Sequence, residues 1–103
     1  MEKAKIVAVY NYGKVHRYVI EKQKDIHGIL CNMFGKMGFD EDQAEEADMI
    51  FDNVECDYIY IGESKDFEAQ LFVTKNKINL ILKTEKTQEE IAKVLKNYLV
   101  FPQ

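Results

Sequence analysis

The sequence predicts a single α+β domain in which a mostly antiparallel five-stranded sheet carries its helices mainly on one face. The chain has 103 residues, of which 47 % are hydrophobic and one is proline. This length and composition suit a single core, and the chain is too short for two domains. Apolar residues alternate with a period of two near the N-terminus and after residue 57, and follow a helical period elsewhere. The predicted order of elements is therefore ββ-α-α-βββ-α.

The first predicted element is a β-hairpin over residues 5–21. Two alternating segments, KIVAVYNY and KVHRYVIE, meet at Gly13, and glycine tolerates the positive φ that a tight hairpin turn requires. The first segment carries apolar side chains on both of its faces. We therefore expect this hairpin to be central in the sheet or covered by a helix.

Two helices are predicted to follow the hairpin. The apolar stripe of the first consists of Ile26, Ile29, Leu30, Met33, Phe34 and Met37. Gly38 is a natural residue to end that helix. Phe39 precedes Asp40, and Gln43 follows three residues later, which is the pattern of a hydrophobic staple with a capping box. The second helix is therefore predicted from about Glu41 to Asp52.

A three-stranded meander and a C-terminal helix complete the predicted domain. The strands are DYIYIG, FEAQLFVT and INLILKT, with Asn76 and Lys77 at the last turn. Thr87 and Glu90 have the spacing of a second capping box, and the chain stops being helical by Pro102. The stripe of this helix consists of Ile91, Val94, Leu95, Tyr98 and Leu99.

Two partial resemblances accompany this prediction. The order of hairpin, helix, meander and helix is similar to longin-like and profilin-like folds, which commonly serve as adaptors; this likeness is one of topology, and a fold does not fix a function. The stretch MGFDEDQAEEA, followed by DNVE, resembles part of a ubiquitin-associated domain. The third helix of such a domain would fall on DYIYIG, whose alternation predicts a strand. We therefore interpret the stretch as a capped helix after a glycine turn.

Cysteine content and hydropathy predict a cytoplasmic protein. Cys31 and Cys56 are the only cysteines, which is too few for the disulfide framework of a small secreted domain. No apolar run approaches the roughly 20 residues of a membrane-spanning helix, and the N-terminal residues alternate instead of forming a signal-peptide core. We expect reduced thiols and no membrane association.

Candidate metal ligands are few in this sequence. His27 and Cys31 are four residues apart on a predicted helix, and Cys56 and His16 are the remaining ligands of the kind that zinc prefers. The spacing lacks the paired CxxC or HxxxH of a zinc motif. An EF-hand is excluded because the loop positions that require Gly and Glu hold Glu45 and Phe51. We therefore predict no metal and no cofactor.

Nucleophilic catalysis also lacks a motif. Ser64 is the only serine and lies in no nucleophile elbow. A Cys-His pair formed by Cys31 or Cys56 with His16 stays open, because such pairs are assembled in space and not in sequence. The sequence therefore favours a protein that is not an enzyme.

The most unusual feature is the segregation of charge. Residues 37–64 contain ten acids and no Lys or Arg, while the rest of the chain holds 14 basic residues and 8 acids. A run of like charges is commonly a solvated helix face, but a patch of this density also steers a basic partner. The same patch repels DNA and RNA. We therefore expect a protein partner with a basic surface and no direct binding of nucleic acid.

Tyrosines lie next to this acidic run. Tyr58 and Tyr60 share one face of a predicted strand, with Ile59 and Ile61 on the other. Tyrosine gives large contact areas at low entropic cost, so an acidic helix beside this strand is a plausible binding surface. The candidate partner-binding residues are Asp40, Glu41, Asp42, Glu45, Glu46, Asp48, Asp52, Glu55, Asp57, Tyr58 and Tyr60.

Three functional hypotheses follow from the sequence. The first is a non-catalytic interaction module, for example a small phage-type inhibitor that blocks a nucleic-acid-binding surface of its partner, or an adaptor. The second is a small enzyme or ligand-binding domain with a pocket between the sheet and the first helix, using His27, Cys31 or Cys56. The third is a structural homodimer that pairs through an exposed sheet edge or through the apolar remainder of the first hairpin.

Overall fold

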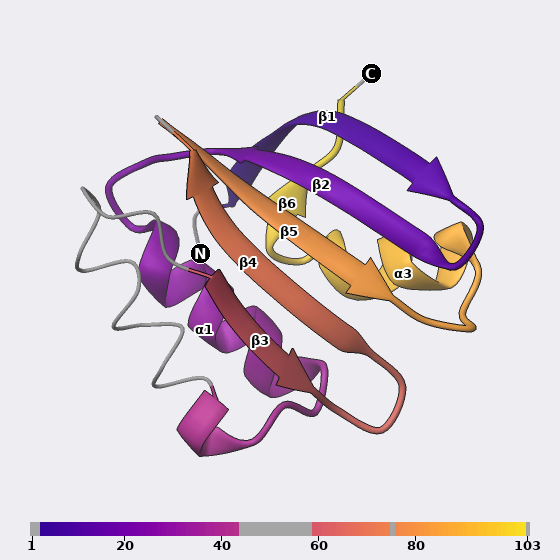
Figure 1. The fold of residues 1–103 in the computed structure, drawn as a ribbon. Coiled ribbons are helices and arrows are strands. Elements are labelled where there is room, and N and C mark those ends of the chain that lie inside the picture. Colours follow the sequence, from indigo (N-terminus) through magenta and orange to yellow (C-terminus); the bar gives the residue numbers. More distant parts are fainter. Residues whose placement is uncertain (1–2, 44–58, 75, 103) are drawn as a thin grey trace.

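The computed structural model describes residues 3–43, 59–74 and 76–102, which form an α+β domain (Figure 1). Six strands and two complete helices have described bounds: β1 (Ala4–Tyr12), β2 (Val15–Glu21), α1 (Ile26–Lys36), β3 (Ile59–Glu63), β4 (Glu68–Thr74), β5 (Lys77–Lys83), α3 (Gln88–Leu95) and β6 (Leu99–Val100). A further helix begins at Glu41. No helix in the described ranges has the length and apolar character to cross a bilayer. The predicted fold class is confirmed.

The strands form one sheet in the order β3-β4-β5-β2-β1-β6. All neighbouring pairs are antiparallel except β1 and β6, which are parallel. Buried residues of α1 and α3 join the same core as buried residues of the strands. In Figure 1 both helices lie on the same side of the sheet, as the sequence predicted. The sixth strand is an addition to the predicted five.

The first hairpin turns at Gly13, whose φ of +60° fits the turn predicted there. Its register contains a β-bulge, because Ile6 pairs with Ile20 while Ala8 pairs with Val19. The bulge places one extra residue on β1 and shifts the alternation of its side chains. This shift explains why β1 reads as apolar on both faces.

The hairpin is less covered than its composition predicted. β2 is central, between β5 and β1, but β1 has only the two-residue β6 on its other side. Tyr10 and Val7 of β1 are 57 % and 37 % exposed. The expectation of a hairpin that is central or covered by a helix therefore holds for β2, whereas β1 lies next to the end of the sheet and is exposed on its outer face.

The meander is confirmed, and one row of side chains shows how it builds the core. Tyr60 pairs with Leu71, Leu71 with Leu80, and Leu80 with Tyr18, so that these residues run side by side across β3, β4, β5 and β2. All of them are buried. Lys77, predicted as a turn residue, instead pairs with Thr74 as the first residue of β5.

The C-terminal helix begins as predicted and ends before the last residues of its predicted stripe. Thr87 Oγ1 accepts a hydrogen bond from the Glu90 amide at 3.2 Å, and the Glu90 carboxylate accepts one from the Thr87 amide at 3.1 Å. The bonds that the Glu90 carboxylate accepts from the Thr87 amide and the Thr87 hydroxyl hold the pKa of Glu90 below its usual value. The helix ends at Leu95, and Leu99 reaches the core from β6. Leu99 fits the helical stripe by spacing alone, so periodicity could not separate the two outcomes.

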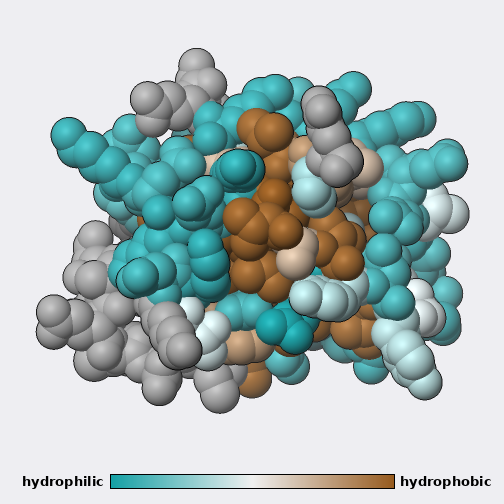
Figure 2. Space-filling model, turned by 90° about the horizontal axis from the view of Figure 1, so that it is seen from above, coloured by the Kyte–Doolittle hydropathy of each residue, from teal (hydrophilic) through white to brown (hydrophobic). Residues whose placement is uncertain are grey.

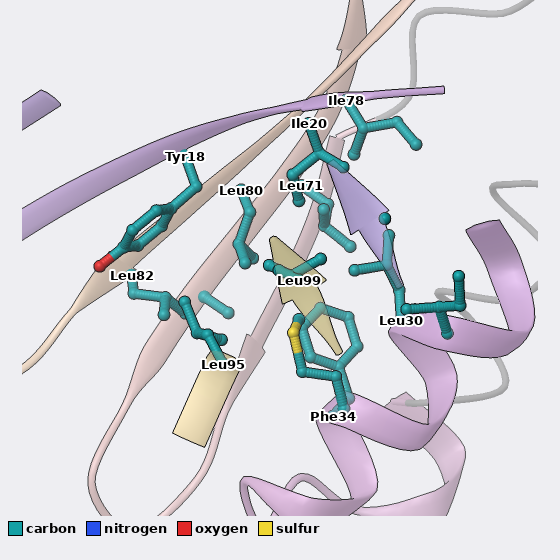
Figure 3. Packing of buried hydrophobic residues seen from close by; sticks show 14 of the residues in the cluster. Tyr18, Ile20, Leu30, Phe34, Leu71, Ile78, Leu80, Leu82, Leu95 and Leu99 are labelled. Carbon is teal, nitrogen blue, oxygen red and sulfur yellow. The ribbon is translucent and has the colours of Figure 1, made fainter. Parts of the chain in front are cut away.

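The space between α1 and the sheet is filled by apolar side chains. Figure 3 shows Leu30 and Phe34 of α1 directed toward strand residues such as Leu71. The Phe34 ring lies 5.8 Å from Tyr60 and 5.0 Å from Phe39 between centroids. We call Phe34, Phe39 and Tyr60 the aromatic cluster. It ties α1, the turn that follows it and β3 into one unit.

Candidate functional site

The first three candidate acids lie at the start of the helix that begins at Glu41. Asp40, Glu41 and Asp42 are exposed. In the described part of the chain they make no ion pair with Lys or Arg. Their negative charges are therefore not neutralised locally, which is the condition for a field that reaches into solvent.

A glycine turn and the aromatic cluster position these acids. Gly38 has a φ of +88°, a conformation that glycine adopts at no steric cost. The next residue, Phe39, is buried against Phe34. Phe39 precedes the N-cap of the predicted hydrophobic staple, and the helix residue that it would contact, Ala44, lies outside the described residues. The backbone that carries Asp40 is thus attached directly to the core.

Tyr60 does not belong to a partner-binding surface. The residue is 2 % exposed and stacks on Phe34, so its side chain lies on the helix-covered face of the sheet. Its neighbour Ile61, which was predicted to lie on the opposite face of the strand, is 68 % exposed. The predicted assignment of faces in β3 is therefore reversed. Gly62 has no side chain and leaves room for the Tyr60 ring on this face.

The remaining candidate acids and one tyrosine lie outside the described residues. They are Glu45, Glu46, Asp48, Asp52, Glu55, Asp57 and Tyr58. Their assignment to a binding surface stays a prediction from the sequence.

The residues proposed for catalysis are not gathered around a pocket in the described ranges. His27 is exposed and Cys31 half-buried on α1, while Cys56 lies outside these ranges. Core side chains occupy the interface of α1 with the sheet. Depressions of about 310 and 410 Å³ lie elsewhere, one beside the β3–β4 turn and one between Gln43 and the ends of β3 and β4 that meet at this turn. Within the described ranges, no three His, Cys, Asp or Glu side chains are placed to share a metal ion.

His16 has a structural environment. It is buried on the inner face of β2, and its Nδ1 donates to Asn11 Oδ1 at 2.7 Å. Burial lowers its pKa below 6.5, because the charged imidazolium loses hydration. The ring therefore stays neutral in the folded protein around neutral pH.

Acidification is expected to destabilise the fold through His16. Because the folded-state pKa is lowered, the unfolded chain binds more protons as the pH falls below about 6.5. The contribution is complete above that pH and is lost progressively toward the folded pKa. His16→Gln should flatten this part of a stability-versus-pH curve measured by urea denaturation. An unchanged slope in the variant would contradict this role.

A second exposed surface lies on the first hairpin, which the sequence predicted only as a possible dimer surface. On the face of the sheet that α1 and α3 leave open, Tyr10 and Tyr12 are 57 % and 87 % exposed. The Arg17 guanidinium carbon lies 5.2 Å from the Tyr10 ring centre, and Arg17 also donates to Asn79 Oδ1 at 2.9 and 3.1 Å. Figure 2, seen from the side on which β1 lies, shows hydrophobic residues gathered in the middle and hydrophilic ones around them. The uncharged run VAVYNY was the signal for this surface.

The described chain thus offers an acidic surface beside α1 and an apolar edge at β1. No family model matches the chain, and neither curated proteins nor solved structures show significant similarity to it. The functional argument rests on these two surfaces.

Proposed function

We propose that the chain is a non-catalytic protein-interaction module whose acidic segment, residues 40–57, docks on a basic surface of a partner protein. The observation that carries this proposal is the segregation of charge: ten acids and no Lys or Arg over residues 37–64. Its described acids, Asp40, Glu41 and Asp42, are exposed and form no ion pair with a described Lys or Arg.

Electrostatics explains why such a segment suits recognition. Like charges in one segment add their fields, and a field of several kT raises the rate at which a basic partner is met. The Phe39 anchor on Phe34 holds the start of the acidic segment on the core. A segment that is already positioned loses less entropy when it binds. The faster encounter with a basic partner and the anchored start of the segment both favour a binding role.

The proposed partner is a protein that itself presents Lys and Arg, such as one that binds nucleic acid. Carboxylates on a helix can occupy the positions of backbone phosphates on such a surface, so the chain would act as an inhibitor by competition. The acidic segment itself would repel nucleic acid. We place this activity in the cytoplasm, in keeping with a chain that holds only two cysteines.

Charge reversal in the acidic segment is expected to abolish partner capture. The double variant Glu41→Lys with Asp42→Lys changes the net charge from −4 to 0, because each reversal adds two charges. Both side chains are exposed, so the fold should persist. Captured partner from a lysate of the source organism should fall by about tenfold or more, because like charges then face each other.

The matched control reverses two acids outside the segment. Glu21→Lys with Glu89→Lys gives the same net charge of 0 from exposed residues on β2 and in the first turn of α3. This control should capture as much partner as the unchanged chain. Equal capture by both variants and the unchanged chain would show that the acidic segment does not bind.

A further inference from the structure

The outer edge of β1 is largely unpaired among the described residues. β6 pairs only with Ala4 and Lys5 of β1. From Val7 to Tyr12 no described strand lies beyond β1. An unpaired strand presents a row of backbone N–H and C=O groups that readily pair with another strand.

This part of β1 lacks the usual protection against pairing. No charged residue occurs between Lys5 and Lys14, whereas β2, β3, β4 and β5 each carry at least one. Natural edge strands are commonly blunted by charge, proline or a bulge. Here only the bulge at Val7 interrupts the edge, and no described strand pairs with the outer side of the residues that follow it. This edge can therefore pair with another strand.

We propose that a second copy of this chain pairs antiparallel along Ala8–Tyr12, across a two-fold axis, and joins the two sheets. This inference does not depend on the proposed function. An axis through Tyr10 sets the two Tyr10 rings side by side and places Tyr12 opposite Ala8 of the other copy. On each side of the central Tyr10 pair, a large Tyr12 then faces a small Ala8, which makes the edge complementary to itself.

The charge distribution favours a second copy over another occupant. The chain carries a net charge of −4, so two copies repel wherever their acids meet. Asp40, Glu41 and Asp42, the described acids of the acidic segment, follow α1, and the aromatic cluster attaches them to β3, four strands from β1 in the sheet. Four strand spacings are about 19 Å, beyond a Debye length of about 8 Å at physiological salt. The uncharged edge is the place where copies meet without that repulsion.

The expected dimer is weak. One strand pair of five residues, with the neighbouring exposed Val100, gives an interface at the small end of the range for transient complexes. Sedimentation velocity from about 10 μM to about 1 mM should show a dimer whose fraction rises with concentration, as expected for micromolar dissociation constants. If the chain stays monomeric over the whole range and Tyr10→Cys forms no covalent dimer, the proposal is overturned.

Two lysines at the edge should abolish the dimer. Tyr10→Lys with Tyr12→Lys places like charges on the pairing strand, and both residues are exposed. The matched control, Ile61→Lys with Gln70→Lys, adds the same charge to a cross-strand pair of exposed residues on β3 and β4. The control should dimerise like the unchanged chain. A dimer that persists in the edge variant would overturn the proposal.

A cross-link tests the two-fold axis independently of affinity. Residues directly opposite in an antiparallel pair have Cα atoms about 4.5–5.5 Å apart, within the span of a disulfide. Tyr10→Cys should therefore give a covalent dimer under mild oxidation, while Ile61→Cys and the unchanged chain, which keeps Cys31 and Cys56, should not. Cross-linking at Ile61 to the same extent would contradict pairing through β1.

Discussion

Gly62→Ala is expected to lower the free energy of unfolding by about 1–3 kcal/mol, the usual cost of overpacking a core. A Cβ at this position would lie 2.3 Å from the Tyr60 hydroxyl oxygen, 2.8 Å from Cζ and 3.0 Å from Cε1. The Tyr60 ring must move, but it is buried and stacked on Phe34. Its displacement therefore disturbs the aromatic cluster. Urea denaturation of both chains measures the difference.

Gly28→Ala is the matched control for this change. Gly28 lies inside α1, and a Cβ there meets nothing within 4 Å. Alanine in a helix interior is more favourable than glycine by about 0.5–1 kcal/mol. The same substitution should thus stabilise the chain at Gly28 and destabilise it at Gly62. A neutral effect at Gly62 would show that Tyr60 is not confined.

Phe34→Ala is expected to cost about 3–5 kcal/mol, the range for deleting a buried aromatic ring. The side chain is fully buried and contacts both other members of the aromatic cluster. A domain of this size is stable by only about 5–15 kcal/mol. Thermal unfolding should show a large fall in Tm, whereas Tyr12→Ala, which removes an exposed ring, should change stability by less than about 0.5 kcal/mol.

The effects of Phe34→Ala and Gly62→Ala on the free energy of unfolding should not be additive. Removing the Phe34 ring opens space beside Tyr60, so that Gly62→Ala should cost less in the Phe34→Ala background. Neighbouring residues that act through a shared partner commonly couple by about 0.5–3 kcal/mol. An additive double variant would indicate that Tyr60 does not transmit the effect.

Much of the fold follows from local patterns in the sequence. The helical stripe of α1, the Thr87 capping box and the turn at Gly13 were all predicted and are all present. Each depends on residues close in the chain, whose spacing decides the local conformation. Leu99 shows the limit, because a helix and a short strand can both bury it at that spacing.

The exposed surfaces were harder to predict because they depend on register. In β3 a shift of one residue exchanges the two faces, and only the contact of Tyr60 with Phe34 decides between them. The free edge of β1 depends on how few residues of β6 pair with it. Neither contact leaves a mark on the alternation of the sequence. The exposure of Asp40–Asp42, by contrast, followed from their charge.

The proposed binding role is tested most directly by capture of a partner with the unchanged chain, washed at low salt and again at about 0.5 M salt. The Debye length falls to a few Å at the higher concentration, so contacts between exposed charges are screened. We expect a basic protein that is held at low salt and released at high salt. The proposal would be contradicted if no protein is held at low salt, or if the protein that is held resists the high-salt wash.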